Sequence, residues 1–194
     1  MNHLEAIDRD TAAGIKYTDI ARKIYLSYPT KAFCEKEDIQ YEIMNNIARY
    51  FHVPLRSIQV TGSAKTGRSF HKKKDFTPGI SDLDVAIIDM HLYTDLMEYV
   101  HNFTKGYSNR TRFPIRDGLS TYAEYIAYLN RGIFRPALMP YSDRRTDIDS
   151  YFGLLSKAHT GLFKSISAVV YLSETFFENK QRSAIKLHAE RDNL

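Results

Sequence analysis

Two short apolar runs on either side of a glycine-containing turn constrain the fold of this chain most strongly. The first is Ser57–Thr61 and the second follows Ser81, and both have the composition of β-strands. Asp82 and Asp84 open the second run with one residue between them. Alternate residues of a strand point to the same face, so both carboxylates project together and Leu83 points the opposite way. Carboxylates this close repel each other unless a cation lies between them, and a divalent metal is the usual partner.

The turn after the first strand has the composition of a phosphate-binding loop. Gly62-Ser63 follows the strand directly, and a further glycine, Gly67, comes shortly afterwards. Glycine at such a turn lets backbone N–H groups approach a phosphate without interference from a Cβ atom, and a following helical turn would add its positive end. The sequence therefore predicts a site for a phosphorylated ligand beside the two carboxylates.

The same loop matches most of the P-loop pattern, which is an alternative interpretation. Residues 62–69 read GSAKTGRS, with Arg68 in place of the P-loop lysine. A P-loop also needs a long helix after its last glycine and a crossover to a parallel strand, whereas Pro78-Gly79 interrupts the chain soon afterwards. The span from Gly62 to Asp82 suits an antiparallel strand pair joined by a loop, and this is the arrangement that we expect.

Length and composition limit the class of protein. At 194 residues, 43% of them hydrophobic, the chain suits one domain with a proper core. The formal net charge of +4 permits an anionic partner such as a nucleotide or RNA without requiring one. The single cysteine, Cys34, excludes an internal disulfide and fits a reducing compartment. No apolar leader or membrane-length apolar window is present, so we expect a cytoplasmic protein without membrane contact.

Helical and strand patterns alternate along the chain, which predicts an α/β (α+β) protein with a mixed sheet flanked by helices. Apolar spacing predicts helices over residues 4–28 with a break near Gly14, and over 35–51, 92–103, 119–129 and 174–191. Residues 166–172 read as a buried strand and Ile133–Phe134 as a short one. Thr146, Asp147 and Asp149 are candidate caps for a helix that runs to Leu155.

These elements fit a single domain over residues 1–194. We divide it into an N-terminal helical layer (1–54), a core (55–173) and a closing helix (174–192). Within the core, Tyr122, Tyr125 and Tyr128 recur every third residue. We interpret them as the packing face of a helix rather than as a platform on which bases stack.

The order of the motifs resembles the signature of the polymerase-beta-type nucleotidyltransferase superfamily. That signature is a glycine-serine turn, here Gly62-Ser63 with the later Gly67, followed by Ser81-Asp82-Leu83-Asp84-Val85 on an apolar strand. The resemblance covers about residues 35–90 and implies a nucleotidyltransferase-like sheet. The family includes minimal nucleotidyltransferases of toxin–antitoxin pairs and enzymes of bacterial defence, so the resemblance suggests either setting.

The resemblance implies a catalytic role for the two aspartates. Asp82 and Asp84 would hold two Mg²⁺ (or Mn²⁺) ions that neutralise the phosphates of ATP or another nucleoside triphosphate and align an attack on the α-phosphorus. The attacking group would be a hydroxyl of a protein, an RNA or a second nucleotide. On this reading the chain is a nucleotidyltransferase that releases pyrophosphate.

The loop residues would bind the nucleotide. Gly62 and Ser63 would contact the β- and γ-phosphates, with Gly67 in the same loop, and Lys65 would add a cationic contact or remain solvated. Ser81, just before the first aspartate, would cap or orient its carboxylate.

Two features depart from the family's pattern. The segment between the glycines and the aspartates is long and contains a basic loop, which is either a grip on nucleic acid or a solvated hairpin tip. This loop contains Arg68, His71, Lys72, Lys73 and Lys74. Family members usually supply a third carboxylate from a later strand, yet residues 166–172 contain no acid. The candidates by position are Asp143, Asp147, Asp149 and Glu174. A catalytically degenerate module that binds nucleotide or RNA, or regulates a partner protein, is therefore the alternative function.

Overall fold

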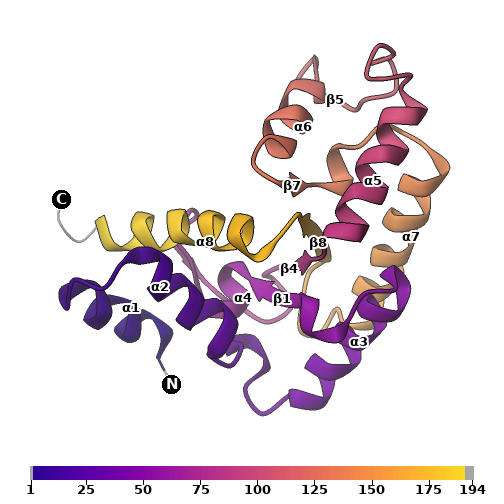
Figure 1. Ribbon diagram of the computed structural model, residues 1–194. Helices are drawn as coiled ribbons and strands as arrows, with labels where there is room; N and C mark the ends of the chain where they lie inside the picture. The colour runs from indigo at the N-terminus through magenta and orange to yellow at the C-terminus, as the bar shows by residue number, and fades with distance from the viewer. Residues whose placement is uncertain (1, 191–194) are drawn as a thin grey trace.

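The computed structural model describes residues 2–190 and contains a four-stranded mixed sheet between two groups of helices (Figure 1). The strand order is β1-β4-β8-β7. These strands are β1 (Ile58–Thr61), β4 (Leu83–Ile88), β8 (Ile166–Tyr171) and β7 (Ile133–Phe134). β4 is antiparallel to β1 and parallel to β8, and β7 is antiparallel to β8. The α+β class and the mixed sheet are thus confirmed, and the antiparallel β1–β4 pair excludes the P-loop arrangement.

The long helices lie close to the predicted positions. They are α1 (His3–Ala12), α2 (Tyr17–Arg22) with its π-helical continuation η1 (Lys23–Ser27), α3 (Glu37–Phe51), α5 (Met90–Phe103), α6 (Tyr122–Leu129), α7 (Asp143–Ala158) and α8 (Glu174–Ala189). The predicted end of the closing helix at residues 191–192 lies outside the described residues. None of the described helices is long and apolar enough to span a membrane.

Short elements connect the long ones. They are the 3₁₀ turns η2 (Lys31–Phe33), η3 (Leu55–Ser57) and η4 (Pro136–Leu138), the one-turn helix α4 (Gly62–Thr66), and two hairpins, β2 (Arg68–Ser69) with β3 (Lys74–Asp75) and β5 (Ile115–Arg116) with β6 (Leu119–Ser120). Leu119 therefore belongs to a hairpin rather than to the helix that was predicted from that residue. The basic loop forms the β2–β3 hairpin.

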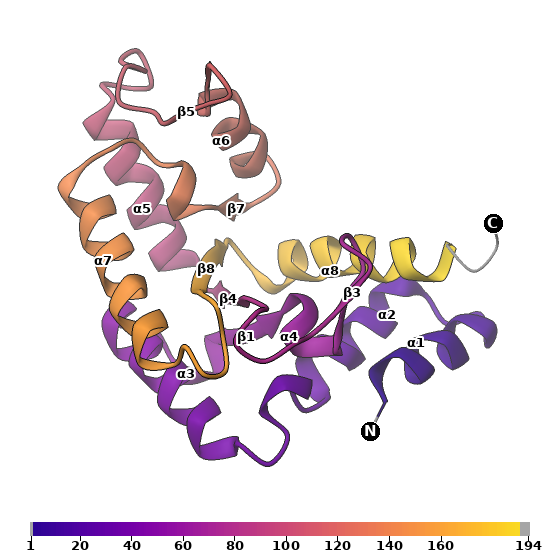
Figure 2. The same ribbon diagram turned by 180° about the vertical axis from the view of Figure 1, so that it is seen from behind.

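A different helical layer covers each face of the sheet. Val85 and Ile87 of β4 pack with α3, α5 and α7, whereas Ala86 packs with α1, α2 and α8. In both views α1, α2 and α8 lie together on one side of the sheet (Figures 1 and 2). The predicted N-terminal layer is thus divided, because α3 joins one face and the preceding helices join the other. Asp84 shares its side of the strand with Ala86 and therefore faces the α8 layer.

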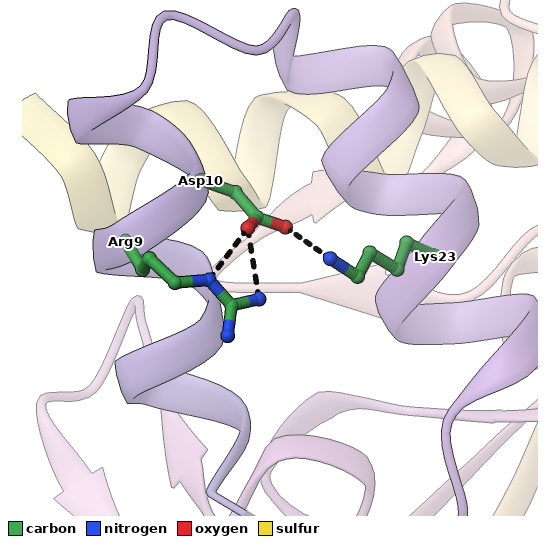
Figure 3. A network of polar contacts seen from close by, with 3 residues as sticks. All are labelled: Arg9, Asp10 and Lys23. Atoms are coloured by element: carbon green, nitrogen blue, oxygen red, sulfur yellow. Dashed lines mark hydrogen bonds and ion pairs between the residues drawn. The ribbon is translucent and has the colours of Figure 1, made fainter.

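An ion pair between the buried carboxylate of Asp10 and the partly exposed Lys23 links α1 to η1 (Figure 3). The Asp10 side chain, on a residue that is 3% exposed, accepts hydrogen bonds from Lys23 Nζ at 2.7 Å and Arg9 Nε at 3.0 Å. The hydrogen bond from Lys23 lowers the pKa of Asp10 below its ordinary value, with a smaller contribution from Arg9. A buried carboxylate without such partners would be strongly destabilising. The pair therefore fixes α1 against η1 in the layer that also contains α8.

Helix α7 begins one turn earlier than predicted. Ser142, rather than Thr146, Asp147 or Asp149, caps it, because the Ser142 hydroxyl accepts a hydrogen bond from the Arg145 N–H at 3.4 Å. Ser142 has the extended backbone that an N-cap requires, whereas the three candidates lie inside the helix.

The tyrosines of α6 form a packing face, as predicted. Tyr125 is buried, and Tyr122 and Tyr128 pack partly buried against the core.

Candidate functional site

The turn after β1 lies against the carboxylate of Asp84. Gly62 has φ +64°, and a Cβ atom there would lie 2.7 Å from Asp84 Oδ2. Thr61 pairs with Asp84 in the β1–β4 ladder, and its hydroxyl donates to the Asp84 carbonyl oxygen at 3.2 Å. A side chain at residue 62 would strain the backbone and displace the carboxylate. Glycine is thus required both by the turn and by the close approach.

Asp82 is held by a serine from the neighbouring strand. Ser165 Oγ, just before β8, donates a hydrogen bond to Asp82 Oδ1 at 2.7 Å. The Ser81 hydroxyl instead accepts a hydrogen bond from the Thr77 N–H at 2.9 Å and closes the local turn. The orienting role that the resemblance implied for Ser81 therefore belongs to Ser165, because the turn already engages the Ser81 side chain. Ser81 still lines the cleft that contains both aspartates.

The electrostatics of the site call for a cation. Desolvation raises the pKa of Asp84 above its ordinary value, and the negative charge of Asp82 raises it further. Lys72 and Arg135 act in the opposite direction. Asp84 remains accessible to solvent although protein surrounds it, so a ligand can still reach its carboxylate. A positive ion between the two aspartates would relieve this repulsion.

The donor set fits a magnesium ion whose coordination is completed by phosphate. Asp82 and Asp84 offer oxygen ligands from one face, and Mg²⁺ is usually held by one or two carboxylates together with substrate phosphates and water. Among residues 2–190, no group of three or more His, Cys, Asp or Glu side chains is arranged to hold a metal. A metal ion at this place would have the two carboxylates as its protein ligands, and other groups would have to complete its coordination.

The partner of Asp84 on the neighbouring strand is a serine rather than an acid. Ser167 of β8 pairs directly with Asp84 of β4 in the parallel ladder, and its side chain is exposed. No acid in the described part of residues 143–174 joins the pair. Asp143 and Asp147 line a separate cavity between α3, α5 and α7, Asp149 contacts Arg145, and Glu174 contacts Arg22.

Lys65 does not point into the site. Its side chain is buried at 3% exposure, and Nζ donates to the carbonyl oxygen of Tyr28 at 2.6 Å. Burial lowers the pKa of Lys65 to about 8. Neither the predicted phosphate contact nor a solvated lysine is correct, because the single turn of α4 directs this side chain toward the N-terminal layer.

Gly67 ends α4. It has φ +86°, and its N–H donates to the Ser63 carbonyl oxygen at 2.8 Å. This left-handed conformation favours glycine for the turn itself, which needs no ligand to explain it.

Two cavities meet at Gly62 and Asp84. The first, which we call the α8 cavity, has a volume of about 320 Å³ and is lined by residues of the sheet, the β2–β3 hairpin and α8. Its lining includes Gly62, Asp84, Tyr128, Ser167, Tyr171 and Gln181. The second, the hairpin cleft, has a volume of about 660 Å³. Its lining includes Gly62, Ser63, Ser81, Asp82, Asp84 and Lys164.

Basic side chains surround the carboxylates in both cavities. Arg68, Arg135 and Lys180 line the α8 cavity, and Lys72, Lys74 and Lys164 line the hairpin cleft. The predicted basic loop is thus part of the wall of the site, although Arg68 also pairs with Asp75 at 2.9 Å.

Sequence reasoning missed Arg135, Lys164, Ser165, Ser167 and Gln181. They come from three later elements and share no motif. The one sequence feature that could have pointed to any of these site residues is that Ser165 and Ser167 flank the start of the predicted strand 166–172.

Comparisons with known proteins add no relative. No protein-family model matches the sequence, and no curated protein or solved structure matches the chain.

Proposed function

We propose that this protein binds the Mg²⁺ or Mn²⁺ complex of a nucleoside triphosphate, in the manner of a nucleotidyltransferase. The observation that carries the proposal is the contact between the glycine turn and the acid pair. A Cβ atom at Gly62 would lie 2.7 Å from Asp84 Oδ2, so a group that binds phosphate and a group that binds metal adjoin each other. Asp82 and Asp84 would hold the cation, and Gly62 and Ser63 would contact the phosphates.

The mixed charges of the site support a ligand that carries both signs. Two adjacent carboxylates favour a cation, since the negative charge of Asp82 adds to desolvation in raising the pKa of Asp84. The lysines and arginines around them require an anion. A metal–triphosphate complex satisfies both requirements in one place, whereas a free metal ion or a free anion satisfies only one.

Nucleotidyl transfer is the second candidate, and the shape of the site favours it. The hairpin cleft adjoins the acid pair and leaves space for an acceptor hydroxyl of a protein, an RNA or a second nucleotide. In the reaction, the acceptor oxygen would bond to the α-phosphorus, the bond to the β-phosphate would break, and pyrophosphate would leave. A bound divalent cation supplies charge neutralisation to this step. Asp82 and Asp84 orient the reactants, and the proton of the acceptor hydroxyl passes to water.

Ser167 bears on the rate of that reaction. A carboxylate on the strand beside Asp84 would accept the proton of the attacking hydroxyl, whereas a serine hydroxyl is a poor base at neutral pH. The geometry therefore supports nucleotide binding best, and transfer at a rate limited by this serine. A role in bacterial defence or in a toxin–antitoxin pair is part of the proposal and rests on the family resemblance.

Calorimetry of ATP binding tests the first proposal. The wild type should bind ATP in the presence of Mg²⁺ and lose at least about tenfold in affinity with EDTA, which corresponds to about 1.4 kcal/mol. Asp82→Ala and Asp84→Ala should abolish the metal dependence. Asp143→Ala is the matched control, because this acid lines a different cavity. Equal binding with and without metal would overturn the proposal.

Transfer is tested with ATP labelled at the α-phosphate. Pyrophosphate release and label transfer to protein, RNA or nucleotide should depend on metal and on both aspartates. Metal-dependent binding without transfer to any of these acceptors would instead assign the chain as a nucleotide-binding module.

A further inference from the structure

The α8 cavity extends beyond Gly62 and Asp84, the residues at which the metal and phosphates are proposed to bind. Asp84 and Gly62 lie at its junction with the hairpin cleft, while Gln181 and Ala184 come from α8. Ser63, Asp82, Lys72 and Lys74 line the hairpin cleft and not the α8 cavity. Phosphates bound at the glycine turn would therefore lie toward the hairpin cleft. The rest of the ligand would enter the α8 cavity.

The lining of the α8 cavity suits a flat aromatic ring. Tyr25, Tyr128 and Tyr171 line it together with Ile133 and Val169. The volume of about 320 Å³ is near the lower limit for small-molecule sites, so it suits one heterocycle with a sugar rather than a chain of nucleotides. Aromatic side chains provide stacking surfaces for bases of any kind.

The side chain of Gln181 is a neutral polar group in this lining and is suited to forming hydrogen bonds with the edge of a base. Gln181 is 5% exposed, and it lines the cavity together with Tyr171. A glutamine amide has two donor hydrogens and a carbonyl acceptor, so it can both donate to and accept from the edge of a base. Glutamine pairs in bidentate fashion with adenine, whose N6 amino group donates while N7 accepts.

We infer that the α8 cavity is the base site of the proposed nucleotide and that Gln181 selects adenine. The inference rests on the proposed function, because it places the base relative to phosphates at Gly62 and Asp84. Among the described residues that line this cavity, Asp84 is the one acid. Arg135 and Lys180 also line this cavity and would carry positive charge near the sugar. The same Arg135 lies over the ring of Tyr128 at 4.8 Å, so Tyr128 forms part of the cavity wall together with this arginine.

Calorimetry with and without the base separates this inference from the proposed function. The probes are Mg²⁺ complexes of ATP, GTP and inorganic tripolyphosphate. The wild type should bind ATP about tenfold more tightly than GTP or tripolyphosphate, the effect of about one well-formed hydrogen bond. Equal affinity for ATP and tripolyphosphate would overturn the base site and leave the proposed function standing. Absence of metal-dependent binding for every probe would overturn both.

Variants on α8 identify the residue that reads the base. Gln181→Leu should lower affinity for ATP about tenfold and remove the preference over GTP, while tripolyphosphate binds as in the wild type. Arg182→Leu is the matched control, since Arg182 is the next residue and its exposed side chain lines another surface hollow. Ala184→Leu fills the cavity and should lower affinity for ATP and GTP alike. Unchanged tripolyphosphate binding shows that each variant is folded, and a loss of the same size for ATP and tripolyphosphate would contradict the assignment.

Discussion

Asp84 of β4 and Ser167 of β8 are direct partners in the parallel strand pair, on the face that opens into the α8 cavity. Neighbouring strands lie about 4.8 Å apart, so a side chain at residue 167 is within reach of a ligand bound by Asp84. This register places a hydroxyl where the proposed chemistry needs a carboxylate.

Ser167→Asp should therefore increase nucleotidyl transfer. A positioned general base contributes about 10²–10⁴-fold to such reactions, and we expect a gain at the lower end of that range. Pyrophosphate release from ATP with Mg²⁺ measures it. Ser167→Asn is the control, because it has the same size without the negative charge. If Ser167→Asp transfers no faster than Ser167→Asn, the lack of a general base at residue 167 does not limit the rate.

Gly62→Ala should lower stability and disrupt nucleotide binding. Positive φ at an alanine destabilises the fold by about 1–2 kcal/mol, and the new Cβ atom would displace the Asp84 carboxylate. Urea unfolding and calorimetry of Mg²⁺–ATP binding measure the two effects.

Gly14→Ala separates these two effects. Gly14 also has positive φ, at +72°, but no atom lies within 4 Å of a Cβ there. Both variants should unfold at lower urea concentration, and only Gly62→Ala should lose ATP binding. Wild-type ATP affinity in Gly62→Ala would argue against the contact as a functional feature.

Ser165→Ala should weaken metal binding. The hydrogen bond to Asp82 orients that carboxylate, and loss of a group that positions a metal ligand commonly lowers metal affinity by about 10–100-fold. Titration of Mg²⁺ in the presence of saturating ATP measures the change. Ser183→Ala is the comparison variant, because its hydroxyl bonds only within the exposed surface of α8. Equal Mg²⁺ affinities in Ser165→Ala and Ser183→Ala would mean that Asp82 binds metal without the hydrogen bond from Ser165.

Lys65 should make stability depend on pH in the alkaline range. Burial lowers its pKa from 10.5 to about 8, so between these values the unfolded chain binds more protons than the folded protein. Stability contributed by this residue therefore rises as pH increases from about 8 to 10.5. The full effect is about 3 kcal/mol, because one pKa unit corresponds to about 1.4 kcal/mol.

Urea unfolding of Lys65→Met between pH 7 and 10.5 measures this effect. The free energy of unfolding of the wild type should rise relative to that of the variant as pH increases. The exposed Lys157→Met controls for general effects of losing a lysine. A constant difference between wild type and Lys65→Met across the range would show that Lys65 does not titrate there.

Local patterns account for the parts of the site that the sequence predicted. Alternation of side chains placed Asp82 and Asp84 on one face of a strand, and Pro78-Gly79 indicated the antiparallel β1–β4 pair. Both inferences concern residues within about thirty positions of one another in the sequence. Over so short a span, backbone geometry allows few arrangements of two strands and a turn. The apolar periodicity of α3, α5 and α8 was likewise sufficient to predict these helices, because helix formation depends on residues close together in the sequence.

Tertiary structure decided the rest of the site. The parallel pairing of β4 with β8 brings Ser165 and Ser167 to the aspartates from far along the chain, and strand composition does not encode register. Lys65 has a charged side chain that sequence assigns to solvent or phosphate, yet the N-terminal layer buries it against the Tyr28 carbonyl. The α8 cavity likewise forms only where α8 and the hairpin close over the sheet. The amino-acid sequence thus determined the acid pair and its turn, because strand and turn geometry are local, and long-range packing determined which groups surround them.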